Sequence, residues 1–374
     1  MKIKSIKMFV VVVPVIPISE GGIAPYRGSQ DKVGTTQASS VLFKVETDNG
    51  IVGWGEMNPI LSYKITKTLV DEYISPKLIG RDPFEIKSIM AQFAPVYDPQ
   101  VNTKSFLTGL QMALWDIMGK ALNMPVYNLL GGKVRDKVEI AYALGILEIK
   151  DTQKKIHQIM DEGYRCLKTK GGKDVVFDVA RTKAMREAAG PSFEIRVDMN
   201  QGYDTIQALR YLRDVEDCDL QYVEQPIKVN RLEDMKNLRV RTRTPVAINE
   251  DCYVPNNFYK AVKMDAIDAG VIDFEPIGGI TELQRLESIA VEAGVPLAHH
   301  CGWDMGIKLA AILHATSTMQ AFTYPMDSTY MAHGDDVLKK RIQIENGAYL
   351  IPSDGPGLGI EPDEEKIEKL GVKI

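Results

Sequence analysis

The sequence predicts an α/β protein in which an α+β unit precedes a barrel of parallel strands and helices. From about residue 138 onward, short apolar segments alternate with amphipathic helical segments. Most successive segments begin roughly 25–30 residues apart, which is the repeat of a barrel with eight strand–helix units. Residues 41–56 differ, because they read as two strands joined by a tight turn, a signature of antiparallel sheet.

Charge and hydropathy exclude some partners. The chain has 374 residues, a net charge of −5 and no block of basic residues, which argues against nucleic acid. No apolar run is long enough to cross a membrane. Pro14 and Pro17 interrupt the apolar stretch 9–13, so we expect an opening β-strand there and not a signal peptide. The four cysteines show no CxxC spacing, which predicts reduced thiols in a cytoplasmic protein.

Residues 1–130 are predicted to form the α+β unit. The strands 41–46 and 51–56 are joined through Asp48-Asn49-Gly50, a strong hairpin signal. Residues 105–122 place apolar side chains on one face at a spacing of 3.6, which predicts an amphipathic helix. This helix is expected to end at Asn123.

The loop 19–36 precedes the hairpin and is rich in glycine and polar residues. It carries Tyr26 and Arg27, residues that simple linkers rarely place beside a hairpin. We therefore expect a mobile surface loop that closes over a substrate.

Eight strands are predicted for the barrel, residues 131–345. They are 138–144, 166–170, 193–200, 220–225, 246–249, 270–273, 296–300 and 321–324. An open doubly wound sheet would give similar spacing, but it favours a glycine-rich phosphate loop after the first strand, and residues 143–146 do not supply one. The last segment, 346–374, is expected to leave the barrel and pack against the N-terminal unit.

Polar residues stand at the ends of six consecutive predicted strands. They are Lys168 and Lys170, Asp198 and Asn200, Glu224, Asn249 and Glu250, Asp273, and His299 and His300. One acidic residue after a strand is usually a helix cap or a solvated loop charge. Repetition at the barrel spacing indicates an active site, because the carboxyl ends of barrel strands meet at one face.

The residues Lys168 and Lys170 are expected to share one face of their strand, because side chains alternate with period two. Two ammonium groups so close disfavour each other's charge, so at least one lysine pKa should be lowered. Such a lysine is a usable general base. A solvent-facing basic patch is the alternative interpretation.

The same alternation predicts which other side chains point into the barrel. Apolar neighbours that suit the outer, helix-covered face leave Asp198 and Asn200 inward on the third strand. On the fifth and seventh strands, they leave Asn249 and His300 inward.

An all-oxygen set of Asp198, Glu224 and one oxygen from the fifth strand suits Mg²⁺. The alternative is a buried carboxylate pair bonded to Lys168, which is disfavoured because two inward carboxylates repel each other without a cation. A substrate carboxylate on the cation would allow a base to remove the adjacent proton and form an enediolate.

Bases are predicted on both sides of this metal site. Lys170 would stand on one side and His300 on the other, with Lys168 adding positive charge near the oxyanion. Asp273, one strand before His300, is positioned to orient the imidazole and raise its basicity.

Motifs along nearly the whole chain resemble those of the enolase superfamily, in particular its mandelate racemase and muconate lactonizing branch. The motifs are Gly53-Trp54-Gly55-Glu56, residues 113–120 and 129–132, Lys-x-Lys, Asp-x-Asn and Glu-x-Pro at the strand ends, and residues 278–281 and 356–359. Residues 168–172, 327–330 and 355–359 further resemble the glucarate-dehydratase-like acid-sugar dehydratases.

The resemblance implies a capping α+β domain over a modified (β/α)₇β TIM barrel. It implies Asp198 and Glu224 as the first two metal ligands. Asn249 matches the third ligand of the glucarate-dehydratase-like group and Glu250 that of the mandelate-racemase-like pattern, and strand alternation favours Asn249.

The resemblance also implies Lys170 as one base, and His300 with Asp273 as the opposing dyad.

We therefore predict a Mg²⁺-dependent dehydratase of a sugar acid or related hydroxy acid. Tyr26, Arg27, Asn200 and Asp327 are the predicted substrate contacts, and a homo-oligomer is expected. A racemase or epimerase of a 2-hydroxy or amino acid derivative is the alternative, since it needs the same two bases. A barrel that binds acids without turning them over is the remoter alternative.

Overall fold

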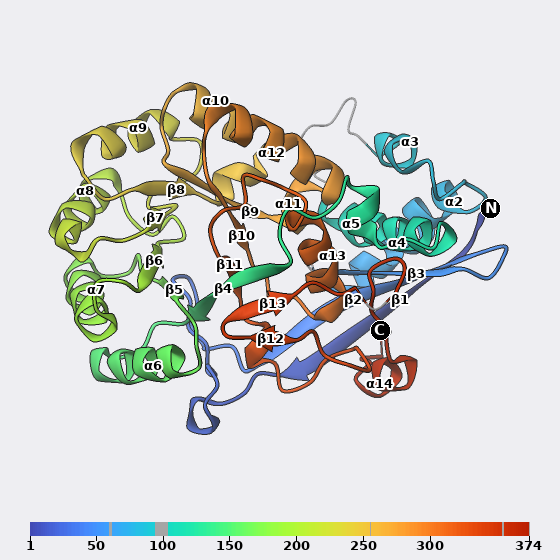
Figure 1. The fold of residues 1–374 in the computed structure, drawn as a ribbon, viewed down its shortest axis with the longest axis horizontal. Coiled ribbons are helices and arrows are strands. Elements are labelled where there is room, and N and C mark those ends of the chain that lie inside the picture. Colours follow the sequence, from blue (N-terminus) through green and yellow to red (C-terminus); the bar gives the residue numbers. More distant parts are fainter. Residues whose placement is uncertain (60–61, 94–103, 255, 354, 374) are drawn as a thin grey trace.

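The computed structural model describes residues 1–59, 62–93, 104–254, 256–353 and 355–373. A three-stranded antiparallel sheet with its helices lies beside a larger barrel of parallel strands (Figure 1). This arrangement confirms the predicted α/β class, with a separate antiparallel unit ahead of the barrel.

The N-terminal unit is built on the strands β1 (Ile3–Pro14), β2 (Gln37–Thr47) and β3 (Val52–Met57), in that spatial order. The helix α4 (Lys104–Ala121) packs on β3, one residue from its predicted bounds at each end. Gly55 permits this packing, because a Cβ there would lie 1.7 Å from the carbonyl oxygen of Gly109. Short helical elements complete the unit: η1 (Ile18–Glu20), α1 (Tyr63–Thr68), η2 (Leu69–Ile74), α2 (Ser75–Leu78), α3 (Ile86–Ala91) and α5 (Val126–Leu129).

The barrel strands run parallel in chain order, and the last one pairs with the first. They are β4 (Lys137–Leu144), β5 (Cys166–Lys170), β6 (Glu194–Asp198), β7 (Tyr222–Glu224), β8 (Val246–Ile248), β9 (Ala269–Asp273), β10 (Leu297–His300) and β11 (Met326–Ser328). In β11, Met326 stands opposite Ile140 of β4. All the carboxyl ends therefore point to one face.

The predicted eighth strand, 321–324, is wrong. Its backbone makes two hydrogen bonds with Leu297 of β10, from Leu297 N–H to Ala321 and from Tyr324 N–H to Leu297. The strand itself begins after Pro325, which has no N–H for a ladder. The other seven predictions overlap observed strands.

Helices surround the barrel (Figure 1). They are α6 (Ile149–Asp161), α7 (Val175–Ala189), α8 (Thr205–Asp214), α9 (Leu232–Arg241), α10 (Asn257–Lys263), α11 (Phe274–Ile277), α12 (Ile280–Ala293) and α13 (Gly306–Thr316), with the 3₁₀ turns η3 (Glu216–Cys218), η4 (Glu250–Tyr253) and η5 (Tyr330–Ala332). None of the helices described has the length and apolar character needed to cross a membrane. All four cysteines are free thiols.

The C-terminal segment joins the two parts. After β12 (Ile344–Glu345), β13 (Ala348–Leu350) pairs antiparallel with β4, and α14 (Glu364–Lys369) then packs against β1. The backbone N–H of Val12 donates to Leu370 at 3.3 Å. The chain thus returns to the N-terminal unit, while the domain boundaries at 130/131 and 345/346 stay predictions.

A buried carboxylate, Asp116 of α4, connects three segments. Its Oδ2 accepts from the Trp54 N–H at 3.0 Å and from Lys120 Nζ at 2.7 Å. Its Oδ1 accepts from the Leu358 N–H at 2.9 Å. Removing the carboxylate would leave buried donors unpaired in β3 and in the C-terminal segment.

We predict that Asp116→Ala lowers the free energy of unfolding by roughly 2–4 kcal/mol, because three donors lose their acceptor. Urea unfolding followed by circular dichroism measures the change. Asp217→Ala is the matched control: its side chain is 97% exposed, and its effect should stay within about 0.5 kcal/mol. Equal midpoints for the two variants would contradict the prediction.

Candidate active site

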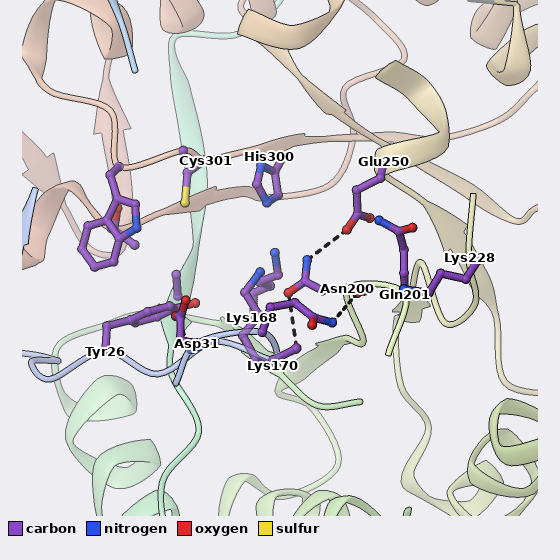
Figure 2. Close-up of a pocket in the computed structure, with 17 residues that line it drawn as sticks. Tyr26, Asp31, Lys168, Lys170, Asn200, Gln201, Lys228, Glu250, His300 and Cys301 are labelled. Carbon is purple, nitrogen blue, oxygen red and sulfur yellow. Dashed lines mark hydrogen bonds between the residues drawn. The ribbon is translucent and has the colours of Figure 1, made fainter. Parts of the chain in front are cut away.

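A cavity of about 410 Å³ opens at the carboxyl ends of the barrel strands (Figure 2). Its lining combines strand ends of the barrel with the loop after η1. The lining residues are Tyr26, Gly28, Ser29, Gln30, Asp31, Ala143, Lys168, Lys170, Asn200, Gln201, Lys228, Glu250, His300, Cys301, Gly302, Trp303 and Thr329. Its position and its charged lining identify it as the candidate active site.

The two lysines of β5 point into this cavity among carboxylates. Lys170 Nζ lies 2.6 Å from Asp198 Oδ2. Lys168 Nζ lies 3.0 Å from Asp198, 3.4 Å from Glu224 and 3.2 Å from Asp327. Lys168 is almost fully buried, whereas 12% of the Lys170 side chain is exposed.

The predicted lowering of a lysine pKa is wrong, because the pKa values of Lys168 and Lys170 are both raised. Burial lowers the pKa of Lys168, but Asp198, Asp327 and Glu224 together outweigh burial and hold it well above its ordinary value. For Lys170, burial also lowers the pKa and the Asp198 carboxylate outweighs it. The repulsion between the two ammonium groups is real but smaller than these attractions.

Asp198 and Glu224 stand opposite each other at the ends of the adjacent strands β6 and β7, and both are fully buried. Burial raises the pKa of Asp198, but Lys168 and Lys170 outweigh it and the pKa is lowered. Burial and the Asp198 charge hold the pKa of Glu224 well above its ordinary value. Neither carboxylate oxygen of Glu224 accepts a hydrogen bond from the residues that the structure describes.

His300 and Asp273 form the predicted dyad on the neighbouring strands β10 and β9. Their Nδ1 and Oδ2 atoms are 3.1 Å apart, and Asp273 Oδ1 accepts the N–H of Glu275 at 3.1 Å. Burial raises the pKa of Asp273, but the hydrogen bond and the charge of His300 outweigh it and lower this pKa to about 2. The aspartate therefore fixes the orientation of the imidazole.

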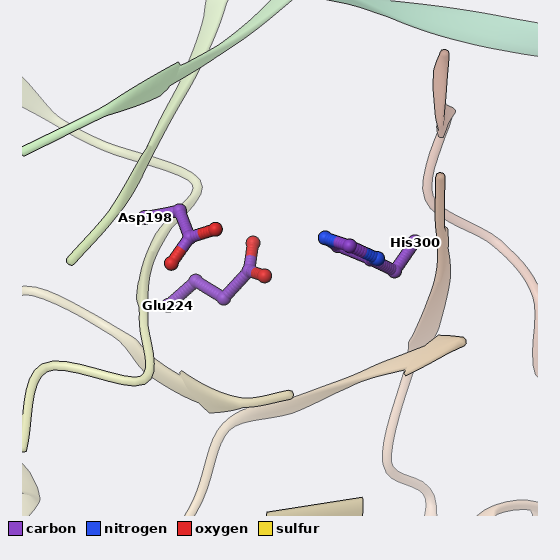
Figure 3. A group of neighbouring side chains, drawn as sticks. All are labelled: Asp198, Glu224 and His300. Atoms are coloured by element: carbon purple, nitrogen blue, oxygen red, sulfur yellow. The ribbon is translucent and has the colours of Figure 1, made fainter. Parts of the chain in front are cut away.

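Three side chains face one another at the carboxyl ends of the barrel strands (Figure 3): His300 lines the cavity, whereas Asp198 and Glu224 are fully buried behind its lining. Donor atoms of Asp198, Glu224 and His300 all lie within 4.8 Å of one another. Buried carboxylate oxygens without hydrogen-bond partners are suitable ligands for a hard divalent cation. The two carboxylates of this group therefore fit Mg²⁺, whereas the imidazole of His300 is not a typical ligand of this ion.

The fifth barrel strand offers two candidates for a third oxygen ligand. Both polar atoms of Asn249 are already engaged, since Nδ2 donates to Val271 O at 2.9 Å and Oδ1 accepts from the Tyr253 hydroxyl at 2.9 Å. Glu250 lines the cavity, and its Oε2 accepts no hydrogen bond from any residue described. Hydrogen bonding thus leaves Glu250 Oε2 as the freer oxygen of the two residues, while Glu250 Oε1 accepts from Asn200 Nδ2 at 3.3 Å. The alternation rule favoured Asn249, but β8 ends at Ile248 and the 3₁₀ turn η4 begins at Glu250.

Two of the predicted substrate contacts line the cavity and two do not. Tyr26 and Asn200 line it. Arg27 does not and is exposed, because it follows Tyr26 in extended backbone, and its side chain lies instead against Gly34. Asp327 is fully buried beneath the cavity, where it pairs with Lys168 and, at 3.1 Å, with Arg196.

The loop predicted to be mobile lies over the mouth of the cavity. Ser29 Oγ donates to Asn200 Oδ1 at 3.3 Å, and Gln30 Nε2 donates to Asn200 O at 3.1 Å. Lys173 Nζ donates to the main-chain oxygen of Asp31 at 3.2 Å. These contacts tie the loop to the ends of β5 and β6, and its mobility stays a prediction.

Sequence reasoning missed the aromatic wall beside His300. Trp303 packs edge-on against Tyr26 with ring centres 5.1 Å apart, and it stacks on His333 at 6.0 Å. Its φ of 63° is unusual for a bulky residue and marks a tightly fixed turn. The available signal was its position three residues after His300, in the loop that follows the strand carrying a predicted base.

The adjacent histidines have opposite environments, as expected from alternation. His300 borders the cavity, whereas His299 is buried and its ring nitrogens have no partner in the described part of the chain. Burial lowers the pKa of His299 to about 4. It is therefore neutral at pH 7.

Two family descriptions match the chain. Residues 151–366 match the enolase C-terminal domain-like family, and residues 21–131 match the mandelate racemase / muconate lactonizing enzyme N-terminal domain.

Relatives of known name match over most of their length. Cis-3-hydroxy-L-proline dehydratase of Roseibium aggregatum is 30% identical over 97% of this chain and 96% of its own. Arabinonate dehydratase of Saccharolobus solfataricus is 31% identical over 85% and 87%. The crystal structure of N-succinyl Arg/Lys racemase from Bacillus cereus superposes with a TM-score of 0.91 at 26% identity, covering 100% and 99% of the two chains.

The buried His299 predicts a pH dependence of stability. The unfolded chain binds this proton more readily, so the stability contributed by the neutral ring is full above pH 6.5 and is lost as the pH falls toward 4. His299→Phe should reduce the loss of unfolding free energy between pH 7 and pH 5 by about 2 kcal/mol. Urea unfolding at both pH values measures the difference. His157→Phe, on the exposed face of α6, is the control and should keep the pH dependence of the parent protein. If His299→Phe also kept that pH dependence of the unfolding free energy, the assignment of this effect to His299 would be refuted.

Proposed function

The chain belongs to the mandelate racemase/muconate lactonizing branch of the enolase superfamily, and on that premise we propose that it catalyses the Mg²⁺-dependent dehydration of a sugar acid or related hydroxy acid. The observation that carries the proposal is the placement of two bases across one cavity. In Figure 2, Lys170 and His300 lie on opposite sides of the space into which both point. The relatives named as dehydratases support the reaction class.

We assign Asp198, Glu224 and Glu250 as the metal ligands. Glu224 and Glu250 contribute three buried oxygens without a hydrogen-bond partner in the part of the chain described, and Asp198 contributes a fully buried carboxylate whose Oδ2 would exchange its contact with Lys170 for the cation. A bound Mg²⁺ would hold the substrate carboxylate and stabilise the negative charge that develops on it. Asp198 would then share its charge with the cation, so Lys170 would lose part of the attraction that keeps it protonated.

The two bases divide the reaction between them. One of them, Lys170 or His300, removes the proton from the carbon next to the substrate carboxylate, and the C–H electrons pass into the enediolate. The electron pair then expels the hydroxyl of the next carbon, which leaves as water after taking a proton from the protonated partner. The resulting enol tautomerises to a 2-keto acid. Asp273 holds the imidazole in place throughout.

Lys168 and the loop over the mouth have supporting roles in this proposal. Lys168 stays protonated among its three carboxylates and places a fixed positive charge beside the forming oxyanion. Ser29 and Gln30 close the cavity through Asn200 and so limit the access of water.

A racemase or epimerase is the second candidate, because two bases on opposite sides of one carbon are what 1,1-proton transfer requires. The similarity to an N-succinyl-L-Arg/Lys racemase favours it. The two reactions differ in whether a hydroxyl leaves.

The test is incubation with Mg²⁺ and a panel of aldonic acids, aldaric acids and hydroxyprolines in D₂O, followed by proton NMR. We expect a 2-keto acid from at least one compound. Lys170→Ala and His300→Asn should each lower kcat by about 10²–10⁴-fold, while exposed Lys236→Gln should not. Exchange of the α-proton with inversion and without a keto product would assign the racemase instead. The absence of both products and exchange would overturn the proposal.

The metal assignment predicts separate losses of affinity. Asp198→Asn and Glu250→Gln should each weaken Mg²⁺ binding by about tenfold or more, measured by calorimetry, since a charged ligand becomes neutral. Asn249→Ala should change it by less than about threefold, because both polar atoms of Asn249 are engaged elsewhere. Glu233→Gln on the exposed face of α9 is the control. If Asn249→Ala lost more Mg²⁺ affinity than Glu250→Gln, Asn249 and not Glu250 would be the third ligand.

A further inference from the structure

We propose that Lys228, Lys173 and Arg231 form a subsite for a second acidic group of the substrate, so that the preferred substrates are acids with an anion at each end. This proposal rests on the proposed function, because it names the substrate class of the same site. It is carried by a second cavity beside the first and by the charges that line it.

The second cavity has a volume of about 420 Å³ and lies over the loops that follow β5, β6 and β7. Its lining residues are Ser29, Gln30, Gly172, Lys173, Gln201, Gly202, Tyr203, Asp204, Ile227, Lys228 and Arg231. Ser29, Gln30, Gln201 and Lys228 line both cavities. A ligand that extends beyond the first cavity on this side therefore passes between these side chains into the second.

The charges in this second cavity are mostly positive. Lys228 is exposed, and no acidic side chain among the described residues lies within ion-pair distance of it. Lys173 contacts the main-chain oxygen of Asp31, and not a carboxylate, through its Nζ. Arg231 is paired with Asp234 at 2.6 Å.

Among the residues that the structure describes, Asp204 is the one carboxylate that lines this cavity. Its Oδ1 accepts the N–H of Gln207 at 2.8 Å as the cap of α8, so it is committed to its helix. Two lysines thus remain available to a ligand anion, with Arg231 at the edge.

The shape of the first cavity directs a longer substrate toward Lys228. On the side of Tyr26 the cavity is bordered by aromatic rings, because the tyrosine ring packs against Trp303, which stacks on His333. In Figure 2, Lys228 lies on the other side of the cavity from Tyr26, beyond Gln201 and Glu250. A substrate whose first carboxylate is held near Asp198 and Glu224 therefore extends toward Lys228.

Close backbone packing fixes the floor of the subsite. A Cβ on Gly202 would lie 2.2 Å from the carbonyl oxygen of Gly172, so the loops after β5 and β6 touch directly. The backbone N–H groups of Gly172 and Lys173 both donate to Asp178 Oδ2, at 2.8 and 3.3 Å. Lys173 is therefore presented from a rigid loop, which reduces the entropic cost of holding an anion.

The experiment measures binding to the Mg²⁺-loaded protein by calorimetry, with an aldarate and the aldonate of the same stereochemistry as probes. We expect the aldarate to bind at least about tenfold more tightly. Lys228→Gln should remove most of this preference and leave the aldonate affinity within about twofold, while Lys228→Arg should retain the preference. Lys236→Gln, which removes a positive charge from α9 outside both cavities, should behave as the parent. An aldonate with a terminal phosphate shows whether the second anion is a carboxylate or a phosphate.

Several outcomes would overturn the subsite. They are equal affinity for the two acids, binding of neither acid, or an equal loss for both acids in Lys228→Gln. These results are independent of turnover, because binding is measured directly. If the protein binds the aldarate more tightly but forms no keto acid, the subsite is supported and the proposed reaction is refuted. If it forms a keto acid but binds the two acids equally, the reaction is supported and the subsite is refuted.

Discussion

The structure depends on the burial of two carboxylates, Asp198 and Glu224, side by side at the ends of adjacent parallel strands. Like charges at this separation are unfavourable unless cations compensate for them. Lys168 and Lys170 supply part of this compensation from β5, and the Glu224 oxygens, which accept no hydrogen bond from the described residues, can take a further cation. A barrel is required because only strands of one direction, closed in a ring, bring these ends together with His300 from the opposite wall.

Much of the fold could be predicted from the sequence because it is encoded locally. The strand 166–170 was predicted with the bounds of β5, and the helix 105–122 falls within one residue of α4. The eighth strand was misplaced because the closure of the barrel is not local. Residues 321–324 are apolar enough for a strand, yet the pairing with β4 that defines β11 starts only after Pro325. Hydrophobic pattern alone does not contain that register.

The residues of the candidate site could likewise be predicted from the sequence only in part. Asp198, Glu224, Asp273 and His300 could be placed together from the sequence, since strand ends have a fixed polarity in a parallel barrel. The predictions that were wrong depend on the direction of side chains beyond the last strand residue, or on charged groups that come from distant strands. Glu250 enters the cavity because a 3₁₀ turn follows β8, and the pKa of Lys168 is raised partly by Asp327, which is brought in from β11.

The position of Asp327 separates the charges that surround the two bases from the loops that line the outer cavity. Arg196 of β6 is fully buried and pairs with Asp327, which pairs with Lys168, so a line of alternating charges runs from the barrel interior to the reacting end of the cavity. Each of these charged side chains is paired with a neighbour of opposite charge inside the barrel. These ion pairs do not include residues of the outer loops. The loops after β5, β6 and β7 carry Lys173, Gln201 and Lys228 and form the outer cavity. Substitution there changes what is bound at the distal end of a substrate, while the charges that position the bases stay the same.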